Sequence, residues 1–204
     1  MGFASLAFLI SALLSYVSAQ QACGSNGVAC IGLPNNCISG ADTSKCDLFA
    51  KVYISPASSY SVRIELTAVP NGPQKLGNPS SIVSRWIAVG FSPNGTMPNA
   101  AAVHCFELNG QASAKLTWNI PDGKVNIGYA TIDQSPLSVV KTSLDGYGLQ
   151  CTVDLKKQFT IAGVNVDLSQ KYFLIDATGP VQSNGTMSVH DKPPGSSAPN
   201  NFSF

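Results

Sequence analysis

The chain has 204 residues, of which 11% are charged, and its formal net charge is +1 at neutral pH. Nucleic-acid binding requires a basic patch that neutralises phosphates, and attraction to anionic lipids requires a cluster of Lys and Arg. Because this nearly neutral chain shows neither pattern, DNA, RNA and anionic membrane surfaces are not expected partners.

Residues 1–19 have the pattern of a secretory signal peptide. The run from Phe3 to Val17 carries no charge, and Ser18 and Ala19 are small residues of the kind that precede cleavage. A membrane-spanning helix needs roughly 20 apolar residues, and this run is shorter. No later segment is apolar enough to span a bilayer, and the polar C-terminus lacks the hydrophobic tail of a lipid-anchor signal. The sequence therefore predicts a secreted, extracellular protein with no membrane anchor.

Residues 20–47 are rich in Gly, Ser, Asn and Cys and predict an irregular N-terminal segment packed on the domain. In a secreted chain, six cysteines indicate three disulfides, although the sequence alone does not choose among the pairings. The simplest pairing places two bridges within this segment and joins the two distant cysteines to each other. Zinc is disfavoured because there is no Cys-x-x-Cys pair and no nearby His. The cysteines are Cys23, Cys30, Cys37, Cys46, Cys105 and Cys151.

Residues 48–191 consist of short strand-like runs separated by turn residues such as Asn109-Gly110. The segments 61–69 and 124–131 alternate between polar and apolar residues, as half-buried strands do. There is no amphipathic helical run. The pattern predicts one all-β domain, an antiparallel β-sandwich of the immunoglobulin-like kind. Further strands are expected at 49–54, 86–91, 102–108, 114–120, 149–155 and 172–177.

The C-terminal residues 192–204 are rich in Pro, Gly, Ser and Asn, and we expect them to form a flexible tail. Three Asn-x-Ser/Thr sequons predict a glycoprotein, in keeping with secretion. Their acceptor residues are Asn94, Asn184 and Asn201.

The motifs of common enzyme classes are absent: there is no Gly-x-Ser-x-Gly elbow, no phosphate-binding glycine loop and no His-Glu-x-x-His. What stands out is the scarcity of Met and His after the signal peptide. Only Met97, Met187, His104 and His190 occur. Taken alone, Met97 in a turn and His190 near the tail are most simply loop and surface residues. His104, beside a cysteine on a predicted strand, is expected to be structural.

An ordered set of segments resembles the DOMON domain. WIAVGFS and Met97 come first, followed by AVHC, by YFLIDATGP and by His190. This family includes the cytochrome domain of cellobiose dehydrogenase and the extracellular domains of ferric-chelate reductase-like proteins. The N-terminal arrangement of Cys23-Gly24, Cys30, Pro34, Cys37 and Cys46 resembles the ferric-chelate reductase branch.

The resemblance implies a sandwich that holds haem b without a covalent bond, between one Met and one His. Carried over to this sequence, Met97 and His190 would be the axial ligands to the haem iron, and Trp86, Phe91 and Tyr172 would line an apolar pocket. Such an iron has a raised reduction potential and no open position for a substrate, which suits single-electron transfer. We therefore expect an electron-transfer protein rather than an autonomous enzyme. Its redox partner, a protein or a small-molecule electron donor or acceptor, would be a separate molecule, in ferric or other extracellular redox chemistry.

The alternative is a haem-free extracellular module that binds sugars or proteins through its end loops, or that serves in adhesion. A purely structural extracellular protein is a third possibility. The presence or absence of a visible absorption spectrum separates the first hypothesis from the other two.

Overall fold

The computed structural model describes residues 23, 25, 27–39, 42–68, 85–120, 126–127, 131–145, 148–191 and 194–201. The predicted signal peptide, residues 1–19, lies outside these ranges, as does most of the strand expected at 124–131. Within them, no helix is long and apolar enough to cross a membrane.

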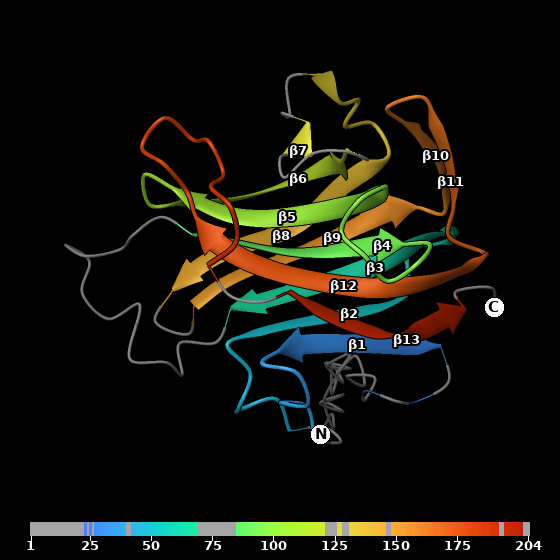
Figure 1. Ribbon diagram of the computed structural model, residues 1–204, viewed down its shortest axis with the longest axis horizontal. Coiled ribbons are helices and arrows are strands. Elements are labelled where there is room, and N and C mark those ends of the chain that lie inside the picture. Colours follow the sequence, from blue (N-terminus) through green and yellow to red (C-terminus); the bar gives the residue numbers. More distant parts are fainter. Residues whose placement is uncertain are drawn as a thin grey trace, which may run out of the picture.

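Two antiparallel sheets form a sandwich (Figure 1). One sheet has the strand order β1-β2-β3-β9-β8, the other has the order β13-β12-β4-β5-β6-β7, and β10 and β11 form a separate hairpin. The all-β sandwich predicted from the sequence is therefore confirmed. The strands are β1 (Val28–Leu33), β2 (Leu48–Ser55), β3 (Ser58–Ala68), β4 (Arg85–Ser92), β5 (Ala100–Leu108), β6 (Gln111–Asn119), β7 (Asn126–Ile127), β8 (Leu137–Asp145), β9 (Gly148–Lys156), β10 (Gln158–Ile161), β11 (Val164–Asp167), β12 (Lys171–Pro180) and β13 (Gly195–Asn201).

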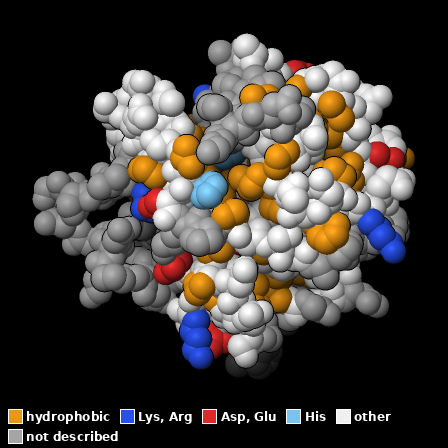
Figure 2. All heavy atoms as spheres, viewed as in Figure 1, with side chains coloured by type: hydrophobic (Ala, Val, Ile, Leu, Met, Phe, Trp, Pro, Cys, Tyr) orange, Lys and Arg blue, Asp and Glu red, His pale blue; other side chains and the backbone are white. Residues whose placement is uncertain are grey.

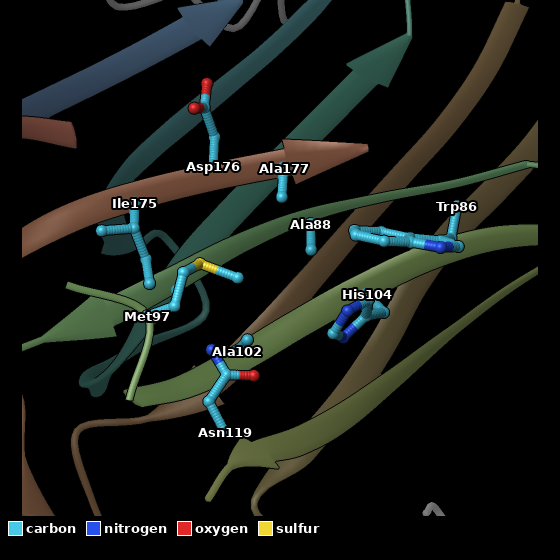
Figure 3. A pocket seen from close by; sticks show the side chains of 10 residues that line it. Trp86, Ala88, Met97, Ala102, His104, Asn119, Ile175, Asp176 and Ala177 are labelled. Carbon is cyan, nitrogen blue, oxygen red and sulfur yellow. The ribbon is translucent and has the colours of Figure 1, made fainter. Parts of the chain in front are cut away.

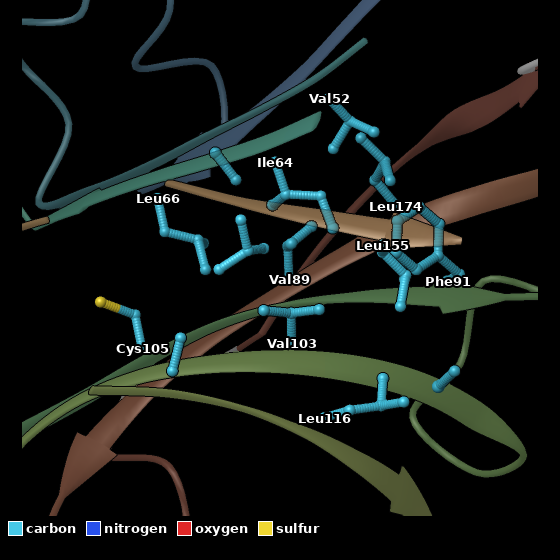
Figure 4. Close-up of a cluster of buried hydrophobic side chains, with 14 of the residues drawn as sticks. Val52, Ile64, Leu66, Val89, Phe91, Val103, Cys105, Leu116, Leu155 and Leu174 are labelled. Atoms are coloured by element: carbon cyan, nitrogen blue, oxygen red, sulfur yellow. The ribbon is translucent and has the colours of Figure 1, made fainter. Parts of the chain in front are cut away.

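The main core lies between the two sheets and follows from the period of two along each strand (Figure 4). On β3, the alternation predicted in residues 61–69 buries Val62, Ile64 and Leu66. Burying apolar surface in this way stabilises the fold by about 25 cal/mol per Å². Residues from the other sheet that complete this core include Ile87, Val89, Phe91, Ala101, Val103, Cys105 and Leu174.

β4 and β5 are buried on both faces. The face of β4 that points away from the main core contributes Trp86 and Ala88 to a second cluster, which also contains Phe106, Ala177 and Val181. We call this the outer cluster. A strand that is buried on both sides needs apolar residues at successive positions rather than at alternate ones. This explains the unbroken apolar run of β4.

The hairpin predicted at Asn109-Gly110 joins β5 to β6. Both residues have positive φ, 54° for Asn109 and 78° for Gly110. That conformation matches the twist of the flanking strands, and Asn-Gly is the dipeptide that adopts it with least strain.

Two predictions about the ends of the domain were wrong. The segment 20–47, expected to be irregular, contains β1, which pairs with β2 along its whole length. The tail 192–204, expected to be flexible, contains β13, which pairs with β12. The side chains of β13 have low strand propensity, so backbone bonding to β12 holds it, helped by a 3.0 Å bond from the Leu174 amide to Ser197 Oγ.

The six cysteines form three disulfides, Cys23–Cys30, Cys37–Cys46 and Cys105–Cys151. This is the simplest pairing that the sequence favoured. The first two bridges secure the chain on either side of β1 and up to the start of β2. The third joins β5 to β9 and therefore connects the two sheets through the core.

Candidate functional site

A hollow lies on the outer face of the six-stranded sheet, where small residues of neighbouring strands stand side by side. Ala88 of β4 pairs with Ala177 of β12, and Gly90 pairs with Ala102 of β5. Figure 2 shows hydrophobic side chains and a histidine gathered on this face of the molecule. The cavity has a volume of about 20 Å³. It is lined by Trp86, Ala88, Gly90, Met97, Ala102, His104, Asn119, Ile175, Asp176 and Ala177.

The loop between β4 and β5 carries Met97 over this hollow (Figure 3). Ser92 Oγ donates a 2.7 Å hydrogen bond to the carbonyl of Thr96, and Asn94 Oδ1 accepts bonds from the Thr96 amide and hydroxyl at 3.1 and 2.7 Å. At its far end, the Asn99 amide donates a 2.9 Å bond to the carbonyl of Asn119 on β6. The loop is thus fixed at both ends, and Met97 packs against the outer cluster.

His104 lies at the other end of the cavity. Its side chain is 2% exposed, and Nδ1 is 2.9 Å from Thr117 Oγ1. The ring meets Trp86 edge to face, with centroids 5.1 Å apart. Burial lowers the pKa of His104 to about 3, so the imidazole is neutral at physiological pH. The structural role expected for His104 did not include this place in the cavity.

The segment between β12 and β13 crosses the same face and carries His190. Trp86 Nε1 donates a 3.0 Å hydrogen bond to the carbonyl of Ser188, and Met187 packs against the outer cluster. Asp191 accepts two 2.9 Å bonds from Arg85, with which it forms an ion pair. His190 is half-buried and is not among the residues that line the cavity.

Two residues predicted to line the pocket lie elsewhere. Phe91 is 1% exposed and belongs to the main core, and Tyr172 packs against that same core. Phe91 follows Gly90 in the chain, so strand alternation turns it to the opposite face of β4 from the cavity. Of the predicted site residues, the structure brings Met97 and Trp86 together in the cavity and places His190 in an adjoining segment.

Asn119 is the second polar side chain in the cavity lining, after His104. It is 6% exposed, and within the described part of the chain its Oδ1 has no hydrogen-bond partner. Asp176 also borders the cavity, but its carboxyl lies on the other side of β12 from Ile175 and Ala177 (Figure 3). There Oδ1 accepts a 2.9 Å bond from the Gly195 amide, and burial raises the pKa of Asp176 to about 6.

Among the residues that the structure describes, no group of three or more His, Cys, Asp or Glu side chains could hold a metal ion. The lining of the hollow is mostly apolar, with the thioether of Met97 at one end and the neutral imidazole of His104 at the other. Two of the predicted glycosylation sites, Asn94 and Asn184, are exposed in the loops beside this face. The side chain of the third, Asn201, lies outside the described part.

Solved structures share this architecture. The cytochrome domain of cellobiose dehydrogenase from Myriococcum thermophilum aligns with a TM-score of 0.53 and 12% sequence identity, covering 83% of this chain and 80% of that one. The sandwich shares its fold with that domain. The cytochrome b domain of pyranose dehydrogenase from Coprinopsis cinerea gives a TM-score of 0.51 and 9% identity, with 77% of each chain covered. No protein-family model and no curated protein sequence matches the chain.

These likenesses confirm the fold implied by the DOMON resemblance. At such low identity they concern the path of the backbone alone. On the outer face, small residues of three adjacent strands form the floor of the hollow. Trp86, Met97 and Ile175 border that space.

Proposed function

We propose that this chain is a secreted b-type cytochrome that holds haem b on the outer face of its six-stranded sheet. Met97 and His190 would hold the haem iron, as the DOMON resemblance implies. With a thioether and an imidazole as its ligands, the haem would supply single-electron transfer. The three disulfides and the sequons support an oxidising, extracellular setting. The electron donor and acceptor are separate molecules, either a redox protein or a small compound.

The observation that carries the proposal is the position of Met97 above a floor of small residues. Side chains larger than alanine at Ala88, Ala102 or Ala177 would fill the hollow. At Gly90 even a Cβ would lie 2.8 Å from Ile175 Cγ1. The apolar walls suit a porphyrin ring, because ligand sites are mostly apolar with a few placed polar groups.

The cavity volume indicates how the cofactor would be accommodated. Small-molecule sites are typically about 300–1,000 Å³, whereas this cavity has a volume of only about 20 Å³. A porphyrin is larger, so it would extend past the floor and displace part of the covering loops. We expect the segment with His190 to move, because it covers this face of the sheet. Its contacts with the face are the hydrogen bonds to Trp86 and Arg85.

Two imidazoles compete for the role of second ligand. His190 is supported by the family resemblance and by its place in a segment that packs on the outer cluster. His104 is supported by its place in the cavity lining and by its neutral state. We assign the ligand role to His190, since the bond between His104 and Thr117 and its packing on Trp86 hold that ring within the strand layer.

The test is the absorption spectrum of the secreted protein, expressed with haem available, before and after addition of dithionite. Sharp low-spin α and β bands after reduction are expected for wild type. His190→Ala should lose the low-spin spectrum, whereas His104→Ala should keep it. The melting temperature of each variant without haem serves as the folding control.

Each outcome has a distinct meaning. A wild-type protein that stays colourless during haem titration would refute the cytochrome proposal and favour a haem-free binding module. A coloured protein in which His104→Ala, and not His190→Ala, abolishes the low-spin bands would transfer the ligand role to His104.

A further inference from the structure

β13 is a weakly held edge strand. It closes the six-stranded sheet beside β12 and also contacts β1 of the other sheet (Figure 1). Its sequence, GSSAPNN, consists of residues with low strand propensity. The pairing with β12 is irregular between Phe173 and Ile175, and Pro199, the partner of Phe173, has no amide hydrogen to donate. The attachment of this strand therefore depends on a few specific contacts.

One of these contacts is at Gly195, the first residue of β13, which lies between two side-chain oxygens. Its amide donates a 2.9 Å hydrogen bond to Oδ1 of Asp176, its partner on β12. A Cβ on Gly195 would collide with that same oxygen and would lie 2.8 Å from Oδ1 of Asn35, in the segment that follows β1. The close approach requires glycine here, and it makes Asp176 the point at which β13 is attached.

The carboxyl of Asp176 is enclosed by protein. The residue is 1% exposed, and within the described part of the chain its Oδ2 has no hydrogen-bond partner. The carboxyl lies on the opposite side of β12 from Ile175 and Ala177, which line the outer cavity (Figure 3). A neutral carboxylic acid can be buried in this way at modest cost, whereas a carboxylate without water or a counter-charge is strongly unfavourable there.

The described elements packed against Asp176 bring no opposite charge to its carboxyl. Neither β13, nor β1, nor residues 34–39 contain a titratable side chain, apart from disulfide-bonded cysteines. On β12 itself, Lys171 is exposed at the start of the strand and Tyr172 packs against the main core. The titratable groups of β2 and β4 have other partners, which are Glu65 for Lys51 and Tyr53, and Asp191 for Arg85.

We propose that Asp176 is a pH-controlled latch for the C-terminal strand: β13 is closed while this carboxyl is protonated and opens locally when it is ionised, which lets water reach the carboxylate. The rest of the sandwich stays folded, because the three disulfides and the described main core include no residue of β13. Opening leaves the edge of β12 unpaired and open to another strand.

The direction of the effect follows from the two states of the carboxyl. Burial raises the pKa of Asp176 to about 6 in the closed strand, although backbone hydrogen bonds act in the opposite direction. In the open strand the carboxyl is hydrated, with an ordinary pKa of 3.8. Protonation therefore favours closure, and this contribution is complete below the ordinary pKa and is lost as pH passes the raised one. The difference between the two values corresponds to roughly a hundredfold in the opening equilibrium.

The experiment is amide hydrogen exchange of the protein without haem, measured by mass spectrometry from about pH 4 to about pH 7 and corrected for intrinsic exchange. Peptides from β13 are compared with peptides from β3 and β9, the central strands of the other sheet. We expect protection of the β13 amides to fall by at least about tenfold over this range, while β3 and β9 stay protected.

Three variants complete the test. Asp176→Asn keeps an oxygen that can accept the Gly195 bond but cannot ionise, so protection of β13 should not depend on pH. Gly195→Ala should open β13 at every pH, and it supplies the comparison if Asp176→Asn fails to fold. Asp167→Asn is the matched control, because Asp167 accepts a backbone bond from Ser169 at the end of the separate β10–β11 hairpin. It should keep the wild-type pH dependence.

Two results would overturn the latch. One is protection of β13 that is constant with pH in wild type or that varies equally in Asp176→Asn. The other is an equal loss of protection in β3, β9 and β13, which would mean that ionisation destabilises the whole domain. Neither result involves haem, so the cytochrome proposal is tested separately by the absorption spectrum.

Discussion

Trp86 and His104 meet edge to face at one end of the outer cavity, with ring centroids 5.1 Å apart and an interplanar angle of 61°. The two rings stand on neighbouring strands, and Trp86 is in turn bonded to the Ser188 carbonyl. A Cβ at Gly179 would lie 2.9 Å from the indole. One end of the cavity is therefore built from rigid aromatic groups, whereas the other is closed by the flexible side chain of Met97.

Met97→Ala should abolish or shift the low-spin spectrum while leaving the sandwich folded. Met97 is partly exposed in a loop whose shape depends on Ser92, Asn94 and Asn99, so its truncation should cost only about 1 kcal/mol. Met187→Ala is the control, because Met187 packs on the outer cluster without lining the cavity. Absorption spectroscopy checks the first effect and thermal unfolding the second. An unchanged low-spin spectrum in Met97→Ala would remove Met97 from the site.

Ala102→Leu should affect haem binding and Ala101→Leu should affect stability, although the two residues are adjacent on β5. Ala102 faces the cavity, so leucine there should block haem binding with little change in stability. Ala101 is in the main core, where overpacking typically costs about 1–3 kcal/mol. Haem titration and denaturant unfolding of both variants measure these effects. Loss of haem binding without loss of stability in Ala101→Leu would contradict the assignment of the two faces.

Removing the Cys105–Cys151 bridge should destabilise the fold more than removing Cys37–Cys46. The bridges close loops with sequence separations of 46 and 9 residues. Chain-entropy arguments give about 4 and about 3 kcal/mol for such loops. The paired alanine variants, unfolded in urea, provide the comparison. A larger loss for the shorter loop would mean that strain or local contacts outweigh chain entropy here.

The buried carboxyl of Asp176 should make stability fall as pH rises from about 4 to about 6. Burial raises the pKa of Asp176 from 3.8 to about 6, so the folded state retains this proton after the unfolded state has released its own. The stabilisation is complete below the unfolded pKa and is lost as pH passes the folded pKa. Urea unfolding across this range should show the slope, and Asp176→Asn should flatten it. Parallel pH profiles for the two proteins would rule out Asp176 as its source.

The strands that could be predicted from the sequence are those whose burial is encoded in their own side chains. β3 alternates and β4 is apolar throughout, and both were located. β8 was missed because it is an edge strand whose Val139 and Val140 are about half exposed, so its pattern does not mark a buried face. β13 was missed because its Gly, Ser, Pro and Asn residues have low strand propensity, although its backbone pairs with β12.

The candidate site shows the same limit. Met97 was singled out because methionine is rare in this chain, and Trp86 because it stands in a strong strand. Phe91 was assigned to the wrong face, and the place of His104 in the cavity was missed, because the sequence shows that β4 and β5 are apolar without showing which of their faces meets the other sheet. A signal for His104 does exist, since it alternates with Val103 and Cys105, two residues that are buried between the sheets.

Along β4 and β5, odd-numbered residues fill the main core and even-numbered residues form the cavity face. Natural selection can therefore act on these two sets of positions separately. A lineage could exchange or abandon its cofactor by changing alternate residues, while the positions that maintain folding stay apolar. The same fold is shared with a cellobiose dehydrogenase cytochrome domain at 12% sequence identity.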